Sequence, residues 1–167
     1  MAGVEDALTG LRFGVLTCSS TRTPADDLSG DALEAGVRAA AGQVVVRSLV
    51  GDDRRRIADL LQSCVASGSV DVILTTGGTG LGPDDVTPEA TLDVGERDVP
   101  GVAELLRLRG LEKTAFAALS RGRAAIRGTT LIVNLPGSPA GARDGLSALL
   151  PVLPHAIAML CGAGHPR

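Results

Sequence analysis

Short apolar runs alternate along this chain with segments whose apolar residues recur at helical spacing. The runs predict strands at residues 12–17, 44–50, 70–75 and 130–135, and the mixed segment 117–127 is interpreted as a further strand. The helical spacing predicts helices from residues 27–29 to Gly42, over 54–66, from Thr87, from Pro100 to Gly110, and after Pro139 to about 160 with a break at Pro151 and Pro154. This alternation indicates an α/β fold with parallel strand pairing and right-handed crossovers.

Helix starts are marked by small polar residues and prolines. Thr87 is the expected N-cap of one helix, with Pro88 in its first position, and Ser138 and Pro139 have the same arrangement near the C-terminus. Either Asp27 or Ser29 can cap the first helix. A hydroxyl followed by proline favours a helix that begins directly after a turn.

Composition places the chain among globular proteins. It has 167 residues, of which 44% are hydrophobic and 21% charged, and Phe13 and Phe116 are its only aromatic residues. We expect a flexible leader over residues 1–10 and one domain over 11–167. The net charge of −3 argues against a nucleic-acid binder. With no signal segment and no membrane-length apolar run, we expect a cytoplasmic protein whose three cysteines are buried free thiols.

Three unusual turns follow predicted strands, at residues 51–53, 75–88 and 134–139. In open parallel sheets the ligand cleft lies at the carboxyl ends of the strands. Within 75–88, four glycines (residues 77, 78, 80 and 82) allow backbone amides to approach an anion, and Thr76 and Thr79 add hydroxyl donors. Neither a Walker nor a dinucleotide-binding spacing is present. The alternative is a tight turn that only packs a helix against the sheet.

Two pairs of carboxylates accompany these turns. Asp84 and Asp85 lie inside the glycine-rich segment, and Asp52 and Asp53 follow the second strand. Carboxylates beside a phosphate site repel it unless a cation bridges them, which favours magnesium held by one or two carboxylates and substrate phosphates. The alternative is that these aspartates cap the helices that follow, and one member of the 52–53 pair can cap while the other binds.

The last turn offers a second anion site. Pro136, Gly137, Ser138 and Pro139 form a strand-to-helix turn whose amides lie at the positive end of a helix dipole. Ser120 and Arg121 add a hydroxyl and a guanidinium, which is suited to forked contacts with phosphate. The alternatives are a plain turn and a solvated surface charge.

Together these motifs resemble a known family. Residues 75–90 (TTGGTGLGPDDVTPEA) are similar to the signature loop of the molybdopterin-binding, Mog/MoaB-type proteins of molybdenum-cofactor synthesis. The resemblance extends in order and spacing to segments at 27–30, 99–104, 119–121, 126–128 and 134–139, and covers the chain from about Phe13 to Gly162.

The resemblance implies a three-layer α/β/α sandwich with a mostly parallel mixed sheet, assembled as a homotrimer. It implies transfer of AMP from ATP to molybdopterin with Mg²⁺, giving adenylyl-molybdopterin and pyrophosphate, and a molybdenum-inserting protein as a downstream partner. Its catalytic, magnesium-binding aspartates correspond to Asp52 and Asp85. Its substrate-binding positions correspond here to Thr76, Gly77, Gly78, Thr79, Gly80, Ser120, Arg121, Pro136, Gly137, Ser138 and Pro139.

Two positions depart from the family's pattern. Ser20 stands where many relatives have an acidic residue, and Asp84 stands where a basic residue is common. These departures keep a second hypothesis open, a non-catalytic molybdopterin-binding relative. A third hypothesis, a nucleotide-processing enzyme that shares the fold, requires an additional domain that this length does not provide.

Overall fold

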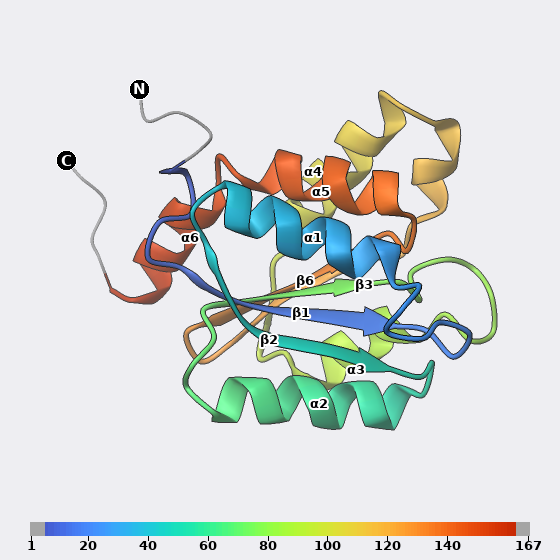
Figure 1. Ribbon diagram of the computed structural model, residues 1–167, viewed down its shortest axis with the longest axis horizontal. Helices are drawn as coiled ribbons and strands as arrows, with labels where there is room; N and C mark the ends of the chain where they lie inside the picture. The colour runs from blue at the N-terminus through green and yellow to red at the C-terminus, as the bar shows by residue number, and fades with distance from the viewer. Residues whose placement is uncertain (1–5, 163–167) are drawn as a thin grey trace.

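The computed structural model describes residues 6–162 (Figure 1). Within them, six strands form one sheet in the order β2-β1-β3-β6-β5-β4. The strands are β1 (Arg12–Cys18), β2 (Gln43–Val50), β3 (Val72–Thr76), β4 (Arg97–Asp98), β5 (Ala124–Arg127) and β6 (Thr130–Leu135). The helices are α1 (Leu28–Ala39), α2 (Arg54–Ala66), α3 (Thr87–Val94), α4 (Pro100–Leu111), the 3₁₀ helix η2 (Ala115–Leu119), α5 (Pro139–Leu149) and α6 (Leu153–Leu160).

The sheet is mixed, as expected. β2, β1, β3 and β6 pair in parallel, whereas β5 and β4 extend the sheet antiparallel to β6. The reversal between β5 and β6 is a two-residue hairpin whose first residue, Gly128, has φ of 56°. The parallel strands point to one edge of the sheet, where the loops after β1, β2 and β3 gather (Figure 1). This edge is the carboxyl end at which parallel sheets hold ligands.

Both faces of the sheet are covered. Val72 and Leu74 pack into a cluster with α1, α5 and α6, whereas Ile73 between them packs into a second cluster with α2 and α3. This is the strand alternation expected of a sheet buried on both faces. Figure 1 shows α1, α4 and α5 on one side of the sheet and α2 and α3 on the other. The predicted three-layer α/β/α sandwich is confirmed.

Several element boundaries differ from the sequence prediction. Thr87 does not cap α3: Val86 occupies that position and Thr87 is the first helical residue, buried behind Gly78. The first helix ends at Ala39, before Gly42, and Ala41 takes the left-handed conformation with φ of 62°. Residues 117–127 are not one strand, because η2 occupies their start and β5 only their last four positions.

Two further expectations need correction. Leu8, placed in the loose leader, is fully buried, and its amide donates to Ala40 O at 2.8 Å, so the chain packs onto the core before residue 11. Residues 1–5 and 163–167 of the expected leader and domain lie outside the described residues. Cys18 and Cys64 are buried free thiols as expected, whereas Cys161 is exposed. No helix among residues 6–162 has the length and apolar character needed to cross a membrane.

Candidate functional site

The loops at the carboxyl edge of the sheet surround a polar cavity of about 370 Å³. We call it the aspartate cavity, because Asp52, Asp84 and Asp85 line it. Its other lining residues come from the loops after β1, β3 and β6: Cys18, Ser19, Thr21, Arg22, Gly77, Gly78, Gly82, Pro83 and Gly137. The three turns singled out in the sequence therefore meet in one hollow.

Asp52 and Asp53 have different roles. Asp53 is exposed and caps α2, accepting a hydrogen bond from the Arg56 amide at 2.8 Å. Asp52 is half-buried and lines the cavity, where its Oδ2 accepts a 2.7 Å hydrogen bond from the Ser20 amide. The choice that the sequence left open is thus resolved: Asp52 faces the cavity and Asp53 caps the helix.

Asp85 is held by its own loop. Its Oδ2 accepts a hydrogen bond from the Gly82 amide at 2.8 Å. A Cβ atom on Gly80 or Gly82 would lie 2.8 or 2.9 Å from that same oxygen. Glycine at both positions therefore lets the backbone wrap around the carboxylate, which explains part of the glycine pattern by packing rather than by ligand approach.

The carboxylates fit magnesium in one particular mode. Each of Asp52 and Asp85 uses one oxygen, Oδ2, for a backbone amide. Among the described residues, no three His, Cys, Asp or Glu side chains cluster closely enough to hold a metal by themselves. Magnesium binds readily through one or two carboxylates that are completed by substrate phosphates and water. The residues present fit that arrangement.

The glycines beside the carboxylates allow close backbone contacts. Gly77 and Gly78 have φ of 98° and 65°, in the left-handed region that favours glycine. A Cβ atom on Gly77 would lie 2.3 Å from Cys18 O, and one on Gly137 would lie 3.1 Å from the Gly77 Cα. The turns after β1, β3 and β6 are therefore in direct contact, with no room for side chains between their backbones.

Cys18 lines the aspartate cavity without being a nucleophile. Burial raises the pKa of its thiol to about 11. The thiolate is the reactive form of cysteine, so at neutral pH this side chain is protonated and unreactive.

Arg121 is directed into the protein framework. Its Nε donates to Gly80 O at 2.7 Å, and its terminal nitrogens donate to Asp85 O and to the Glu89 carboxylate. Burial opposes the charge on Glu89, but the hydrogen bonding and charge of Arg121, a backbone hydrogen bond and the charge of Arg54 together outweigh burial and lower the Glu89 pKa. Arg121 thus holds both ends of the loop that carries Asp85. Its side chain lines neither the aspartate cavity nor the second cavity, which is described below.

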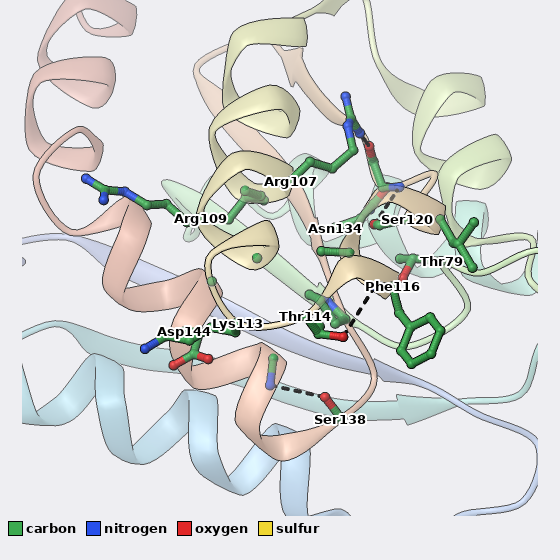
Figure 2. A pocket seen from close by; sticks show the side chains of 18 of the residues that line it. Thr79, Arg107, Arg109, Lys113, Thr114, Phe116, Ser120, Asn134, Ser138 and Asp144 are labelled. Atoms are coloured by element: carbon green, nitrogen blue, oxygen red, sulfur yellow. Dashed lines mark hydrogen bonds between the residues drawn. The ribbon is translucent and has the colours of Figure 1, made fainter.

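A second cavity of about 430 Å³ lies between α4, η2 and the start of α5 (Figure 2). We call it the α4 cavity. Its apolar wall includes Ala103, Leu106, Phe116, Ala117 and Leu119, and its polar residues include Arg107, Arg109, Lys113, Thr114, Asn134 and Asp144. Five of the predicted substrate-binding residues line it: Thr79, Gly80, Ser120, Pro136 and Ser138.

The predicted site residues are therefore divided between two adjacent cavities. Gly77, Gly78 and Gly137 face the aspartate cavity, whereas Thr79, Gly80 and Ser138 face the α4 cavity. The same two turns form the partition between them. Of the remaining predictions, Thr76 is buried with its hydroxyl bonded to Pro136 O at 2.7 Å, and neither it nor Pro139 lines a cavity.

Sequence reasoning missed two parts of the site. One is Arg22, the only cationic side chain among the described residues that line the aspartate cavity. The other is the wall from α4 and η2. Phe116 was visible as one of two aromatic residues and is 78% exposed, a signal of a binding surface that composition alone did not locate.

Comparison with known proteins places this arrangement in context. Residues 14–155 match a family model described as a probable molybdopterin binding domain. A "Molybdenum cofactor biosynthesis bifunctional protein" from Synechococcus elongatus is 38% identical over 161 residues, which are 95% of this chain and 50% of that protein. A "Molybdopterin adenylyltransferase" from Helicobacter pylori is 34% identical over 160 residues, with 91% of this chain and 89% of that protein covered.

A solved structure agrees with the fold. The crystal structure of the molybdopterin biosynthesis enzyme MoaB from Thermus thermophilus superposes with a TM-score of 0.83 at 47% identity, covering 91% of this chain and 97% of that one. The chain spans only about half of the bifunctional Synechococcus and Chlorobaculum relatives and about a quarter of the Drosophila relative named cinnamon.

Proposed function

Since the chain belongs to the family described as the probable molybdopterin binding domain, we propose that it transfers the adenylyl group of ATP to the terminal phosphate of molybdopterin. The products are adenylyl-molybdopterin and pyrophosphate. The observation that carries the proposal is that Asp52 and Asp85, from two different loops, line one cavity with the backbone of Gly77 and Gly78. Carboxylates and anion-binding amides meet where a metal-assisted reaction of phosphates needs them.

We assign the triphosphate of ATP to the aspartate cavity. Asp52 and Asp85 would hold the magnesium ion, which neutralises negative charge on the phosphates when it is bound. Gly77 and Gly78 line this cavity with backbone in the left-handed region that favours glycine, and their backbone would lie beside the phosphates. Arg22 adds the positive side chain of this cavity.

We assign molybdopterin to the α4 cavity. Leu106, Phe116 and Leu119 offer apolar surface to a flat heterocycle, while Ser120 offers a hydroxyl group. The start of α5 at Ser138 would receive the terminal phosphate, because a helix N-terminus favours an anion. An oxygen of that phosphate would then attack the α-phosphorus of ATP directly, at the edge of the turns that separate the two cavities, and the bond to the β-phosphate would break with its electron pair leaving on pyrophosphate.

Within this scheme the protein acts mainly by positioning. Two polyanions repel each other in water, and fixing them on either side of the turns at 77–80 and 136–138 replaces that encounter with a held geometry. Arg121 keeps Asp85 and Gly80 in place from behind. We further propose that the chain works in the cytoplasm as a homotrimer and passes its product to a molybdenum-inserting protein; sedimentation analysis tests the trimer.

The proposal is tested by incubating the protein with molybdopterin, ATP and magnesium and measuring pyrophosphate release. Asp52→Asn and Asp85→Asn are each expected to lower turnover by about a hundredfold while leaving the fold intact. Asp53→Asn is the matched control, because that residue only caps α2 and asparagine caps equally well. If Asp52→Asn and Asp85→Asn both turned over as fast as Asp53→Asn and the unmodified protein, the two carboxylates would have no role in the reaction.

A non-catalytic molybdopterin-binding protein remains the second candidate. Asp84 favours it, since a third carboxylate beside one arginine adds negative charge where ATP has to bind. Molybdopterin binding without any pyrophosphate release from the unmodified protein would establish this alternative.

A further inference from the structure

Arg22 lines the aspartate cavity and contacts the turn that also borders the α4 cavity. It extends from the loop after β1 with about a quarter of its side chain exposed (28%). One terminal nitrogen donates to Ser29 Oγ at 2.5 Å, and the other donates to Gly137 O at 2.7 Å. A guanidinium held at both ends is not a solvated surface charge.

The contact with Gly137 completes a series. The Gly77 amide donates to Leu135 O at 3.2 Å, the Thr76 hydroxyl donates to Pro136 O at 2.7 Å, and Arg22 donates to Gly137 O. Three successive carbonyls of the turn after β6 are thus each engaged by a donor. The orientation of each peptide in this turn is therefore fixed by the neighbouring loops.

Because of peptide geometry, the contact between Arg22 and Gly137 O also determines the direction of the Ser138 amide. No peptide bond in the described chain is cis, and in a planar trans peptide the carbonyl and the following amide point in opposite directions. Because Arg22 holds Gly137 O on its own side, the Ser138 amide is turned away from Arg22. Ser138, Ala140 and Gly141 at the start of α5 line the α4 cavity.

We propose that Arg22 is a positioning residue that couples the two cavities: from the aspartate cavity it orients the Gly137–Ser138 peptide so that the Ser138 amide, at the start of α5, faces an anionic group in the α4 cavity. This inference rests on the proposed function for the identity of that group, the terminal phosphate of molybdopterin. The orientation itself depends only on contacts within the chain.

The two-armed guanidinium is essential to this role. Ser29 and Gly137 are reached by different terminal nitrogens of the same side chain. A lysine ammonium carries the same charge on a single nitrogen and has no fork. Arg22→Lys therefore separates charge from geometry, while Arg22→Gln removes the charge as well.

The test compares Arg22→Gln and Arg22→Lys with Arg54→Gln. Arg54 is the matched control, because it forms an exposed forked pair with Asp93 and lines neither cavity. In the ligand-free proteins, amide hydrogen exchange at Gly77 and Gly141, whose amides donate to Leu135 O and Ser138 Oγ of this turn, is expected to be about tenfold faster in both Arg22 variants and unchanged in the control. Equilibrium binding of molybdopterin is expected to weaken about tenfold in both, including the variant that keeps the charge.

Exchange rates and molybdopterin affinities of Arg22→Gln within twofold of the unmodified protein would overturn the proposal. If that variant does not fold, the same limits applied to Arg22→Lys decide. Should the unmodified protein fail to bind molybdopterin, the proposed function is wrong, and the exchange rates alone then decide whether Arg22 orients the turn.

Discussion

Ser20 and Asp52 hold each other through two reciprocal hydrogen bonds. The Ser20 amide donates to Asp52 Oδ2 at 2.7 Å, and the Asp52 amide donates to Ser20 Oγ at 2.7 Å. The pair joins the loop after β1 to the turn after β2 and leaves Asp52 Oδ1 for another partner. The Ser20 hydroxyl therefore holds the backbone of the proposed catalytic residue without adding negative charge.

Ser20→Ala is expected to lower turnover about fivefold, the effect of losing one hydrogen bond that positions Asp52. The loss should appear as a higher magnesium requirement, with little change in stability because Ser20 is exposed. Ser20→Thr keeps the hydroxyl and should retain the activity. Magnesium titrations of the three proteins measure this, and an unchanged magnesium requirement in the alanine variant would remove Ser20 from the site.

Arg121→Lys separates two interpretations of that arginine. The family resemblance implied a substrate-binding role, whereas the structure shows Arg121 bound to Gly80 O, Asp85 O and Glu89. We expect the variant to lose about 1–2 kcal/mol of stability, since charge-assisted hydrogen bonds are lost at a half-exposed position, and to turn over at least tenfold more slowly.

Arg123→Lys is the control for this prediction, because Arg123 is exposed and only faces Asp98 at 3.6 Å. Urea unfolding and pyrophosphate release are measured on both variants. A weaker affinity for ATP or molybdopterin in Arg121→Lys, with stability unchanged, would restore the substrate-binding role.

The parts of the fold that sequence predicted are those with continuous local signals. The strand at residues 130–135 and the helix at 54–66 agree with β6 and α2 at both ends. An apolar run and a capped amphipathic segment each carry within their own residues the pattern that marks the element. β4 escaped prediction because its two residues pair with β5 through the backbone alone and carry no apolar pattern. Thr87 was misread because its burial behind Gly78 depends on the fold.

The candidate site was likewise predictable only where the signal is local in the sequence. The meeting of the turns at 51–53, 75–88 and 134–139 in one cavity was predictable because the carboxyl ends of parallel strands converge. Their division between two cavities was not predictable, because neighbouring residues of one loop, Gly78 and Thr79, face opposite sides of a partition that exists only after folding. The direction of Arg121 and the bracing of Gly137 by Arg22 likewise depend on side-chain contacts across 41 and 115 positions of sequence.

Gly78→Ala is expected to destabilise the protein through a clash as well as through backbone conformation. Gly78 has φ of 65°, and a Cβ atom there would lie 2.3 Å from Thr87 Oγ1. Gly68→Ala is the matched control, with φ of 64° and nothing within 4 Å of the added Cβ. The control should lose about 1 kcal/mol for the left-handed conformation. Gly78→Ala should lose more and should also bind ATP more weakly, because Gly78 lines the aspartate cavity. Equal unfolding free energies in the two variants would show that the Thr87 side chain moves aside at no cost.

Asp27 gives the protein a predictable loss of stability in acid. Its side chain is 1% exposed and accepts hydrogen bonds from Thr17, Arg47 and the Gly30 amide. Burial alone would raise the Asp27 pKa, but these partners overcome it and hold the pKa below its ordinary value. The unfolded chain therefore takes up a proton near pH 4 while the folded protein is still ionised. The stabilisation is fully present above that pH and is lost as the pH falls through the folded pKa.

Asp27→Asn tests this, because asparagine can still cap α1 while the charge is removed. At pH 7 the variant should be about 3 kcal/mol less stable, the low end for a broken buried ion pair, since Arg47 also faces Glu34 at 3.5 Å. Below about pH 4 its unfolding free energy should fall less steeply with decreasing pH than that of the unmodified protein. Asp59→Asn, at an exposed position on α2, should leave the slope unchanged. Urea unfolding between pH 3 and 7 measures the slopes, and parallel curves for the unmodified protein and Asp27→Asn would mean that the pKa of Asp27 is the same in the folded and unfolded states.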